Sequence, residues 1–398
     1  MKVKYAVLGA GPAGLAFANT LLDRGETSFV VLEKERTAGG LCRSVMLDGA
    51  PFDFGGGHIL DVRNIEARDF VFRFLPEEEW NIFDRITKIV VDGSEIDYPI
   101  EANIWQFPEK LQKAYLASIA EAGCNRGLPM PKRFTDWVRW KLGDRIAESY
   151  MLPYNAKIFS CDLDALGTYW LSKLPDVSYE DVLSSCRERR MFGKLPAHAR
   201  FYYPKKHGYG EAFLRMAERL SGHVEYGEEA ARLDPKTHRI NGTWEAETIV
   251  TTVPWKGIAA DFPAEIQSEI AKLLYAGTDT DYRPESADTP SHWTYYADQR
   301  LSYHRIIYRK NLQPGAAGCW TETNALRREK DAAGPYHFQN EFTYPLNTID
   351  KPAAIAKVLD YGREAGIIGL GRWGEWEHYN SDVVISRGIA LANRLAAR

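Results

Sequence analysis

Glycines near the N-terminus have a spacing that could bring the backbone close to a phosphate-bearing ligand. Residues 9–14 carry the pattern G-x-G-x-x-G, with Pro12 and Ala13 inside it. Gly9 would permit a tight turn, Gly11 a close approach of the backbone to a pyrophosphate, and Gly14 close packing of a helix on a strand. A helix that starts here would also direct its unpaired N–H groups at the phosphates.

A carboxylate completes this pattern. Glu33 follows Gly14 by nineteen residues and ends the apolar run at 28–32, where it could accept hydrogen bonds from an adenosine ribose. The apolar run at 3–8 and the helical periodicity at 13–24 supply the other two parts of one β-α-β unit. The unit predicts a dinucleotide site, but FAD and NAD share this fingerprint.

Two further segments distinguish between these dinucleotides. Residues 36–43 contain a basic residue and the pair Gly39-Gly40 followed by Leu41, and they resemble the R-x-G-G element of the amine-oxidase-like FAD superfamily. Residues 52–58 resemble the flavin-facing D-x-G-G loop of the same superfamily. Three matches in this order predict FAD.

Short segments along the rest of the chain resemble one family within this superfamily. The matching segments are 56–58 (its G-G-H loop), 98–103 (Y-P-F-Q-N), 150–159 (P-Y-N-x-K-x-W), 202–210 (F-P-K-x-G-G-x-G), 295 and 305 (a Tyr-to-Arg spacing of ten), 344–347 (Y-P-x-N) and 371–376 (G-R-x-G-x-Y/W). Because the matches run in order over nearly the whole chain, the sequence resembles the UDP-galactopyranose mutase family.

The resemblance implies an isomerase that interconverts the pyranose and furanose forms of a nucleotide-diphosphate sugar. In that family the N5 atom of reduced flavin attacks the anomeric carbon, and the sugar ring opens and recloses while it is held as a flavin–sugar adduct. There is no net redox change. The resemblance therefore implies FAD that is active in its reduced form, and an electron donor such as NADPH or a flavin reductase.

The resemblance also assigns site residues. It gives catalytic roles to His58, near the flavin and the sugar, and to Arg305, in a diphosphate clamp with Tyr295 and Tyr344. The other substrate residues are Tyr98, Glu101, Tyr150, Asn155, Phe159 and Lys173. The cofactor residues are Gly9, Gly11, Pro12, Ala13, Gly14, Glu33, Lys34, Gly39, Gly40, Leu41, Gly56, Gly57, His58, Val224, Arg372, Tyr379, Ser381 and Asp382, and no metal is expected.

Several of these side chains have simpler interpretations. Arg305 could be a strand arginine paired with a carboxylate, and Tyr295 could only pack a sheet face. His58 could cap a turn, and Asn155 could cap a helix. The sequence alone does not decide between these interpretations.

Four positions depart from the family pattern. Leu174 stands where the family has a second diphosphate arginine, although Lys173 beside it could supply a point charge. Asp61 replaces an aromatic residue that stacks on uracil, Glu101 replaces a glutamine, and Phe159 replaces a tryptophan. Three of the four lie where the family reads the base.

Glu101 leads to a hypothesis about that base. A carboxylate only accepts hydrogen bonds, so it would suit an edge that presents donors, such as that of guanine, rather than uracil. The alternative is that Glu101 is exposed to solvent. His198 replaces a family asparagine near the hexose, so the identity of the sugar is also undetermined by the sequence.

Two other functions share the FAD motifs. The first is an oxidoreductase of the amine-oxidase type that takes a hydride from an amine or a carbon–carbon bond. The second is a non-catalytic flavoprotein. Neither requires Tyr295, Arg305 and Tyr344 to surround a diphosphate.

Periodicity predicts the elements that must position these residues. Segments 105–123 and 133–152 should be helices. Alternating segments at 292–297, 303–308 and 337–344 should form an antiparallel sheet. Further strands are expected at 200–204, 222–226, 247–253 and 367–371, and a final helix at 381–396.

These elements predict an α/β fold with a discontinuous Rossmann-type FAD-binding domain. That domain should comprise residues 1–85, 195–255 and 350–398. A mainly helical substrate domain would cover 86–194, and an antiparallel sheet substrate domain 256–349.

Composition excludes some other classes. The 398 residues carry a formal net charge of −4, which argues against a protein that coats nucleic acid. The five scattered cysteines include no C-x-x-C pair, so neither a disulfide framework nor a zinc site is indicated. No run of eighteen apolar residues occurs, and we expect a cytoplasmic protein without a membrane span.

Overall fold

A parallel sheet lies under the N-terminal glycine motif. The computed structural model describes residues 1–171, 176–193, 198–328 and 336–397. Five parallel strands come together from three separate parts of the chain, in the order β10 (Val224–Tyr226), β2 (Phe29–Glu33), β1 (Lys2–Leu8), β13 (Trp244–Thr251) and β20 (Ile367–Gly369). The sheet continues from β13 through the short strands β12 (Arg239–Ile240), β11 (Arg232–Asp234) and β14 (Ala259–Ala260).

Helices cover both faces of this sheet, as the continuous apolar strands require. Val7 and Val31 face one core with three helices, and Leu8 and Leu32 face another core with two. The first set is α1 (Pro12–Asp23), α7 (Glu211–Arg219) and α12 (Ser381–Ala396). The second set is α8 (Ala264–Lys272) and α10 (Lys351–Glu364). The predicted β-α-β unit and C-terminal helix are confirmed.

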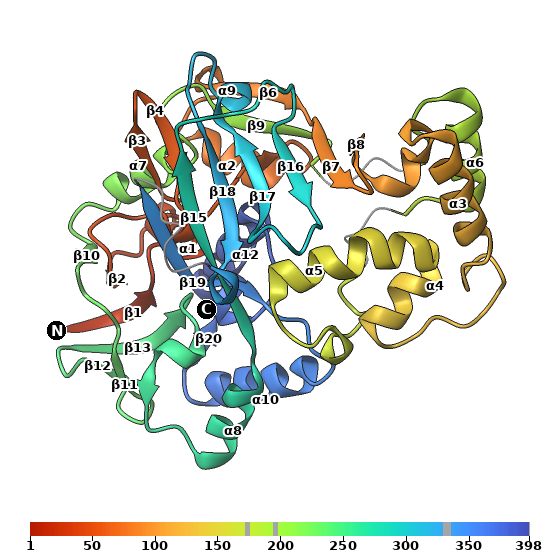
Figure 1. Ribbon diagram of the computed structural model, residues 1–398. Helices are drawn as coiled ribbons and strands as arrows, with labels where there is room; N and C mark the ends of the chain where they lie inside the picture. The colour runs from red at the N-terminus through yellow and green to blue at the C-terminus, as the bar shows by residue number, and fades with distance from the viewer. Residues whose placement is uncertain (172–175, 194–197, 329–335, 398) are drawn as a thin grey trace.

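A second sheet of seven strands stands beside the first (Figure 1). Its order is β19 (His337–Pro345), β15 (Tyr275–Arg283), β18 (Cys319–Asn324), β17 (Tyr303–Tyr308), β16 (Trp293–Tyr296), β7 (Thr87–Val91) and β8 (Ser94–Asp97). The three predicted antiparallel strands are present, but β16 pairs with β7 in parallel. β15 and β18 were not predicted, and β7 and β8 come from the segment expected to be mainly helical.

The helical lobe projects from one side of the molecule (Figure 1). Its helices are α3 (Glu109–Ala120), α4 (Phe134–Ile146), α5 (Leu152–Phe159) and α6 (Tyr179–Glu188). Segment 133–152 is helical as predicted, but it is interrupted at Gly143. Gly143 breaks the helix, with φ 77° and ψ 162°. Only glycine fits there, since an added Cβ would lie 2.4 Å from the carbonyl oxygen of Ser118 on α3. A π-helical turn at 147–151 then leads into α5.

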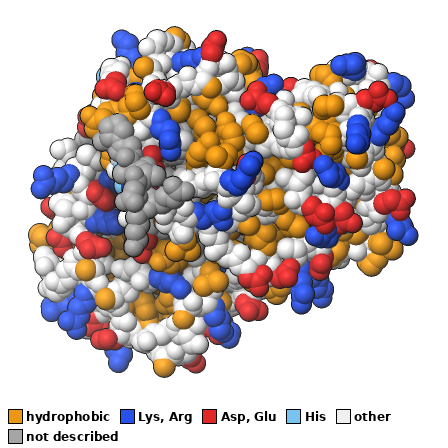
Figure 2. Space-filling model, viewed as in Figure 1, with side chains coloured by type: hydrophobic (Ala, Val, Ile, Leu, Met, Phe, Trp, Pro, Cys, Tyr) orange, Lys and Arg blue, Asp and Glu red, His pale blue; other side chains and the backbone are white. Residues whose placement is uncertain are grey.

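Smaller elements join these parts. They are the hairpin β3 (Ser44–Leu47) and β4 (Ala50–Asp53), the sheet of β5 (Leu60–Asp61), β9 (Arg200–Pro204) and β6 (Trp80–Asp84), and the helices α2 (Ile65–Phe72), α9 (Arg309–Leu312) and α11 (Gly371–Gly374). Figure 2 shows acidic and basic side chains interspersed over this face, with hydrophobic side chains gathered near the junction of the helical lobe and the body. None of the described helices is long and apolar enough to cross a bilayer.

Candidate functional site

The glycine motif forms a bare backbone surface at the start of α1. Gly14 packs so tightly under Gly9 that a Cβ there would lie 2.1 Å from the Gly9 carbonyl oxygen. Gly11, by contrast, faces open space, because a Cβ added to it would meet only the Cα of Gly40, at 3.9 Å. Gly11 and Gly40 therefore bound an open channel that leads to the N-terminus of α1, where no side chain caps the helix.

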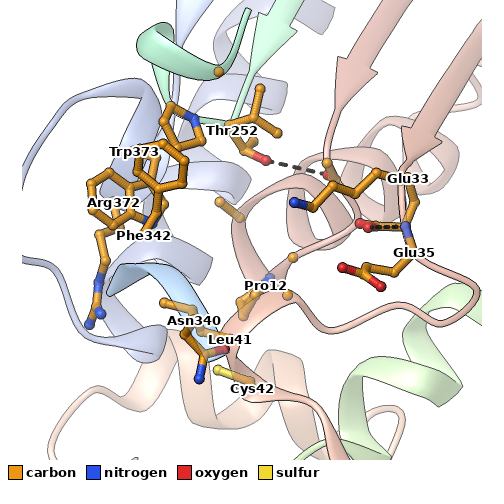
Figure 3. Close-up of a pocket in the computed structure, with 18 of the residues that line it drawn as sticks. Pro12, Glu33, Glu35, Leu41, Cys42, Thr252, Asn340, Phe342, Arg372 and Trp373 are labelled. Carbon is orange, nitrogen blue, oxygen red and sulfur yellow. Dashed lines mark hydrogen bonds between the residues drawn. The ribbon is translucent and has the colours of Figure 1, made fainter. Parts of the chain in front are cut away.

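This channel is part of a cavity of about 430 Å³. Figure 3 shows Pro12, Leu41 and Cys42 near one another, with Phe342, Arg372 and Trp373 elsewhere around the space. The predicted cofactor residues that line the cavity are Gly9, Gly11, Pro12, Ala13, Glu33, Lys34, Gly40, Leu41, His58, Arg372, Tyr379 and Ser381. The predicted residues outside its lining are Gly14, Gly39, Gly56, Gly57, Val224 and Asp382.

The residues outside the lining hold the walls in place. The N–H of Gly39 donates to the carbonyl of Ala10. Val224 pairs with Val31 between β10 and β2. Asp382 is buried at the start of α12 and accepts a hydrogen bond from Asn64.

The carboxylate of Glu33 accepts hydrogen bonds from the backbone around it. Its two carboxylate oxygens accept from the N–H of Ala10 (2.8 Å) and of Glu35 (3.0 Å). Burial raises the pKa of Glu33, while these two hydrogen bonds oppose the rise. Each oxygen keeps a lone pair, so the carboxylate can still accept a hydroxyl from a ligand.

Arg372 places a guanidinium group in the cavity wall. Its Nε donates to the carbonyl of Tyr379 (2.9 Å) and its Nη1 to that of Thr343 (3.0 Å). No carboxylate among residues 1–171, 176–193, 198–328 and 336–397 forms an ion pair with it. A partly buried cation with only neutral partners among the described residues favours an anionic or electron-rich ligand.

His58 lies where this cavity approaches the second sheet. Its Nδ1 lies 3.1 Å from the carbonyl oxygen of Gly56. Burial and the charge of Arg372 lower the pKa of His58 to about 4, so the ring is neutral at physiological pH. Because a carbonyl can only accept, Nδ1 carries the proton and Nε2 is an acceptor. His58 thus stabilises its own turn and also lines the cavity.

The second sheet carries a row of polar side chains across its strands. Tyr295, Arg305, Glu322 and Thr280 are successive cross-strand partners on β16, β17, β18 and β15, so they share one face. Arg305 donates from Nε (2.8 Å) and Nη2 (2.7 Å) to Glu322. Its Nη1 donates to none of the described residues.

Glu322 was missed by the sequence analysis. It is fully buried, and it also accepts a hydrogen bond from the N–H of Gly57 (3.1 Å). Burial alone would raise the pKa of Glu322, but the charge of Arg305 holds it at about 2. A Cβ on Gly56 would lie 2.0 Å from its carboxylate. Glu322 therefore joins the clamp arginine to the loop that carries His58, and no local sequence pattern marks it.

Tyrosines surround Arg305. The Tyr295 ring lies 5.8 Å from that of Tyr98 and 5.1 Å from that of Tyr154. Tyr154 also stacks on Tyr150, at 5.4 Å. Burial raises the pKa of Tyr344 to about 12, with the charge of Glu322 adding to the rise.

Arg85 and Tyr154 are further members of this cluster that the sequence analysis did not select. The guanidinium of Arg85 lies 4.5 Å from the centre of the Tyr98 ring and 3.4 Å from the hydroxyl of Tyr295. Phe159 contacts one member of the cluster, Tyr344, with 6.5 Å between the ring centres. A second cation beside Tyr295 could not be foreseen, because Arg85 precedes β7, whose pairing with β16 is a tertiary contact.

Other predicted residues lie apart from the cluster or have other roles. Asn155 is inside α5 and donates to the carbonyl of Met151 (2.7 Å), so the capping interpretation was wrong. Asp61 is buried beside Arg63 (2.6 Å) and His198 (3.1 Å), and so it is not open to stack or pair with a base. Lys173 lies outside the described residues.

Glu101 is buried, with 7% of its surface exposed, so the exposed alternative was wrong. It lines a second cavity, in the helical lobe, and burial raises its pKa to about 7 from an ordinary value of 4.5. This cavity contains none of the tyrosines that surround Arg305.

Replacing Glu101 with glutamine should alter how stability depends on pH. Because the pKa is higher in the folded state, the neutral carboxyl stabilises the fold at low pH, and that contribution is lost as the pH rises from about 4.5 to about 7. The loss should reach about 3 kcal/mol. Urea unfolding at pH 4.5 and pH 8 should show this decline in the wild type and not in E101Q.

The exposed Glu109 on α3 offers a matched control, since its side chain is 79% exposed. E109Q should follow the wild type at both pH values. If E101Q also followed it, Glu101 would not be a desolvated carboxyl.

Two comparisons show which known proteins this chain is similar to. The NAD(P)-binding Rossmann-like domain family matches residues 7–74, which run from the end of β1 through the glycine motif and β2 to the loop with His58 and α2. The N-terminal part of the chain is therefore similar to a Rossmann-like domain of this family.

Solved structures of several enzymes share the fold of the whole chain. The structure of reduced UDP-galactopyranose mutase matches with a TM-score of 0.89 and 21% identity, over 99% of this chain and 96% of that one. Cyclohexylamine oxidase from Brevibacterium oxydans IH-35A (0.68, 12%, 99% of each chain) and a protoporphyrinogen oxidase homologue from Exiguobacterium sp. 255-15 (0.71, 13%, 99% of each) also match. The predicted fold is confirmed, and at these identities the likeness concerns the fold.

Proposed function

We propose that FAD binds in the first cavity. The open channel between Gly11 and Gly40 and the uncapped start of α1 suit a pyrophosphate, and Glu33 can accept from a ribose hydroxyl. Arg372 supplies a cation at the far end of the same cavity. When bound and reduced, FAD would supply a nucleophile for a sugar's anomeric carbon.

The activity we propose is interconversion of the pyranose and furanose forms of a nucleotide-diphosphate sugar. The observation that carries this proposal is the position of the Arg305–Glu322 pair, which contacts the His58 loop on one side and the tyrosine cluster on the other. A diphosphate leaving group needs donors that stay in place while the sugar ring opens. Glu322 fixes one edge of Arg305, so Nη1 is presented without loss of side-chain freedom.

The tyrosines would supply further donors without adding charge. Burial keeps the hydroxyl of Tyr344 protonated at physiological pH, since its pKa is raised to about 12. Arg85, beside Tyr98 and Tyr295, would provide the second cation that the dianionic group requires. Neutral His58 would accept a hydrogen bond at Nε2 from a sugar hydroxyl.

The second candidate is an oxidoreductase of the amine-oxidase type. Its support is the likeness of the whole fold to cyclohexylamine oxidase. Such an enzyme needs no diphosphate site, so Arg85 and Arg305 would have only structural roles.

Turnover by the dithionite-reduced protein tests the proposal. A panel of UDP-, GDP-, dTDP- and CDP-hexoses would be incubated with reduced and with oxidised protein, and the products separated by chromatography. We expect furanose product from the reduced protein alone. Oxygen consumption with an amine, and no sugar product, would instead establish the oxidoreductase.

A further inference from the structure

A β-bulge lies at His304, beside the Arg305–Glu322 pair. Tyr303 on β17 is opposite Thr323 on β18, and Arg305 is opposite Glu322, so His304 is one extra residue in β17. Consecutive residues of a regular strand point to opposite faces of the sheet. The bulge instead brings both His304 and Arg305 to the same carboxylate. Nε2 of His304 lies 3.5 Å from Oε2 of Glu322, the oxygen to which Nε of Arg305 donates.

The ring of His304 is enclosed by protein. Its side chain is 1% exposed, and its ring stands at 69° to that of Tyr154, with 6.3 Å between the ring centres. Tyr154 also contacts Tyr295, so His304 lies against the tyrosine cluster around Arg305. An enclosed ring cannot contact a ligand directly. His304 can therefore affect the site only through a neighbouring side chain.

The two ring nitrogens of His304 have different surroundings. A carboxylate only accepts hydrogen bonds, so Nε2, which faces Glu322, carries the proton and Nδ1 carries the lone pair. Burial lowers the pKa of His304, which favours this neutral form. Nδ1 is buried and has no hydrogen-bond partner among the described residues. An unpaired buried nitrogen costs stability, and an apolar side chain of similar size would avoid that cost, so packing alone does not explain a histidine here.

The contact with Glu322 does explain it. Arg305 and Glu322 are joined by hydrogen bonds from Nε and Nη2, which fix the two side chains relative to each other but not relative to the rest of the site. Contacts with two other groups fix the pair in place, the N–H of Gly57 at Oε1 (3.1 Å) and Nε2 of His304 at Oε2. Without His304 the carboxylate would keep the Gly57 contact, and the pair could turn about it.

We propose that His304 is a positioning residue that directs the guanidinium of Arg305 through Glu322. Its Nε2–H holds one oxygen of the carboxylate, and the carboxylate holds two nitrogens of the guanidinium, so Nη1 is presented in one direction. That the ligand of Nη1 is a diphosphate rests on the proposed function. The direction of the guanidinium does not, because it is a property of the protein that can be measured without a ligand.

Exchange of the Arg305 Nε–H with solvent measures how firmly the guanidinium is held, and NMR of the FAD-bound protein can follow it. The resonance would be assigned by its absence in R305K. In H304L, which fills the space without a donor, exchange should be about tenfold faster than in the wild type. In H304Q, whose amide N–H can take the place of Nε2–H, exchange should stay within about threefold of the wild type. H304M repeats the comparison with a flexible apolar side chain, should H304L not fold.

Exchange in H304L and H304M as slow as in the wild type would overturn the proposal. Equally fast exchange in H304L and H304Q would also overturn it, since only the shape of the imidazole would then matter.

Calorimetric titration of the same FAD-bound proteins with inorganic pyrophosphate tests the link to the proposed function. H304L should bind pyrophosphate about tenfold more weakly than the wild type, and H304Q within about threefold of it. In the R305A background H304L should cause no further loss, and a further tenfold loss there would contradict an action through Arg305. If pyrophosphate bound equally to R305A and the wild type while exchange followed the expected order, His304 would remain a positioning residue and the diphosphate clamp would be rejected.

Discussion

Replacing Gly11 with alanine should remove the cofactor and leave the fold intact. The residue has φ −79°, and an added Cβ would meet nothing closer than the Cα of Gly40 at 3.9 Å. The free energy of unfolding of the apoprotein should therefore change by less than about 1 kcal/mol. The methyl group would nevertheless fill the channel through which a pyrophosphate reaches α1. We expect FAD affinity to fall about 10- to 100-fold, measured from the visible absorbance of bound flavin.

Gly14 provides the comparison. An added Cβ would lie 2.1 Å from the carbonyl oxygen of Gly9, so the strand and helix would have to separate. G14A should lose about 2 kcal/mol of stability in addition to the cofactor. If G11A bound FAD like the wild type, the pyrophosphate would not pass between Gly11 and Gly40. Equal stability of G14A and the wild type would contradict the packing role of Gly14.

The second large effect should follow from breaking the Arg305–Glu322 pair. Glu322 is fully buried and the side chain of Arg305 is 18% exposed, so removing either leaves a desolvated charge. R305A and E322Q should each lower the free energy of unfolding by about 3 kcal/mol. The double variant R305A/E322Q should lose less than the sum of the two, because it leaves no unpaired charge. Chemical denaturation of the four proteins gives the coupling energy.

The loss of activity should differ between the variants R305A and E322Q. R305A removes the proposed diphosphate donor, and kcat/KM for the nucleotide sugar should fall about 100- to 1000-fold. E322Q keeps the guanidinium and should lose less activity than R305A at a similar cost in stability. R300A removes an exposed arginine paired with Asp298, and serves as the control with a change under about 1 kcal/mol. Equal activity of R305A and the wild type would exclude Arg305 from the substrate site.

The sequence predicted the glycine turn and the β-α-β unit at the N-terminus correctly, because their signals are local. The spacing of Gly9, Gly11 and Gly14 and the following Glu33 encodes a turn and a β-α-β unit within about thirty residues. In the structure Gly9, Gly11 and Glu33 line one cavity together with Arg372, whose position came only from the resemblance. The prediction of the helical lobe was weaker, because Gly143 breaks a helix that periodicity alone would continue.

The sequence could not predict which polar side chains are buried or which groups they pair with. Nothing near Glu101 indicates that its carboxyl is buried and opens into a cavity, and Asp61 showed no sign of its pairing with His198. Burial depends on which elements pack over a residue. The same residue type is therefore consistent with both an exposed and a buried position until the fold is known.

The sequence by itself determined the α/β class, the dinucleotide turn and the alternating strands that carry Tyr295 and Arg305, since each follows from residues close together in the chain. Only the tertiary structure decided that Arg305 pairs with Glu322, that Glu322 supports the His58 loop, and that Arg85 lies beside Tyr295. These contacts join β7, β16, β17 and β18, and the register of these strands depends on which face of the sheet is buried in the folded protein.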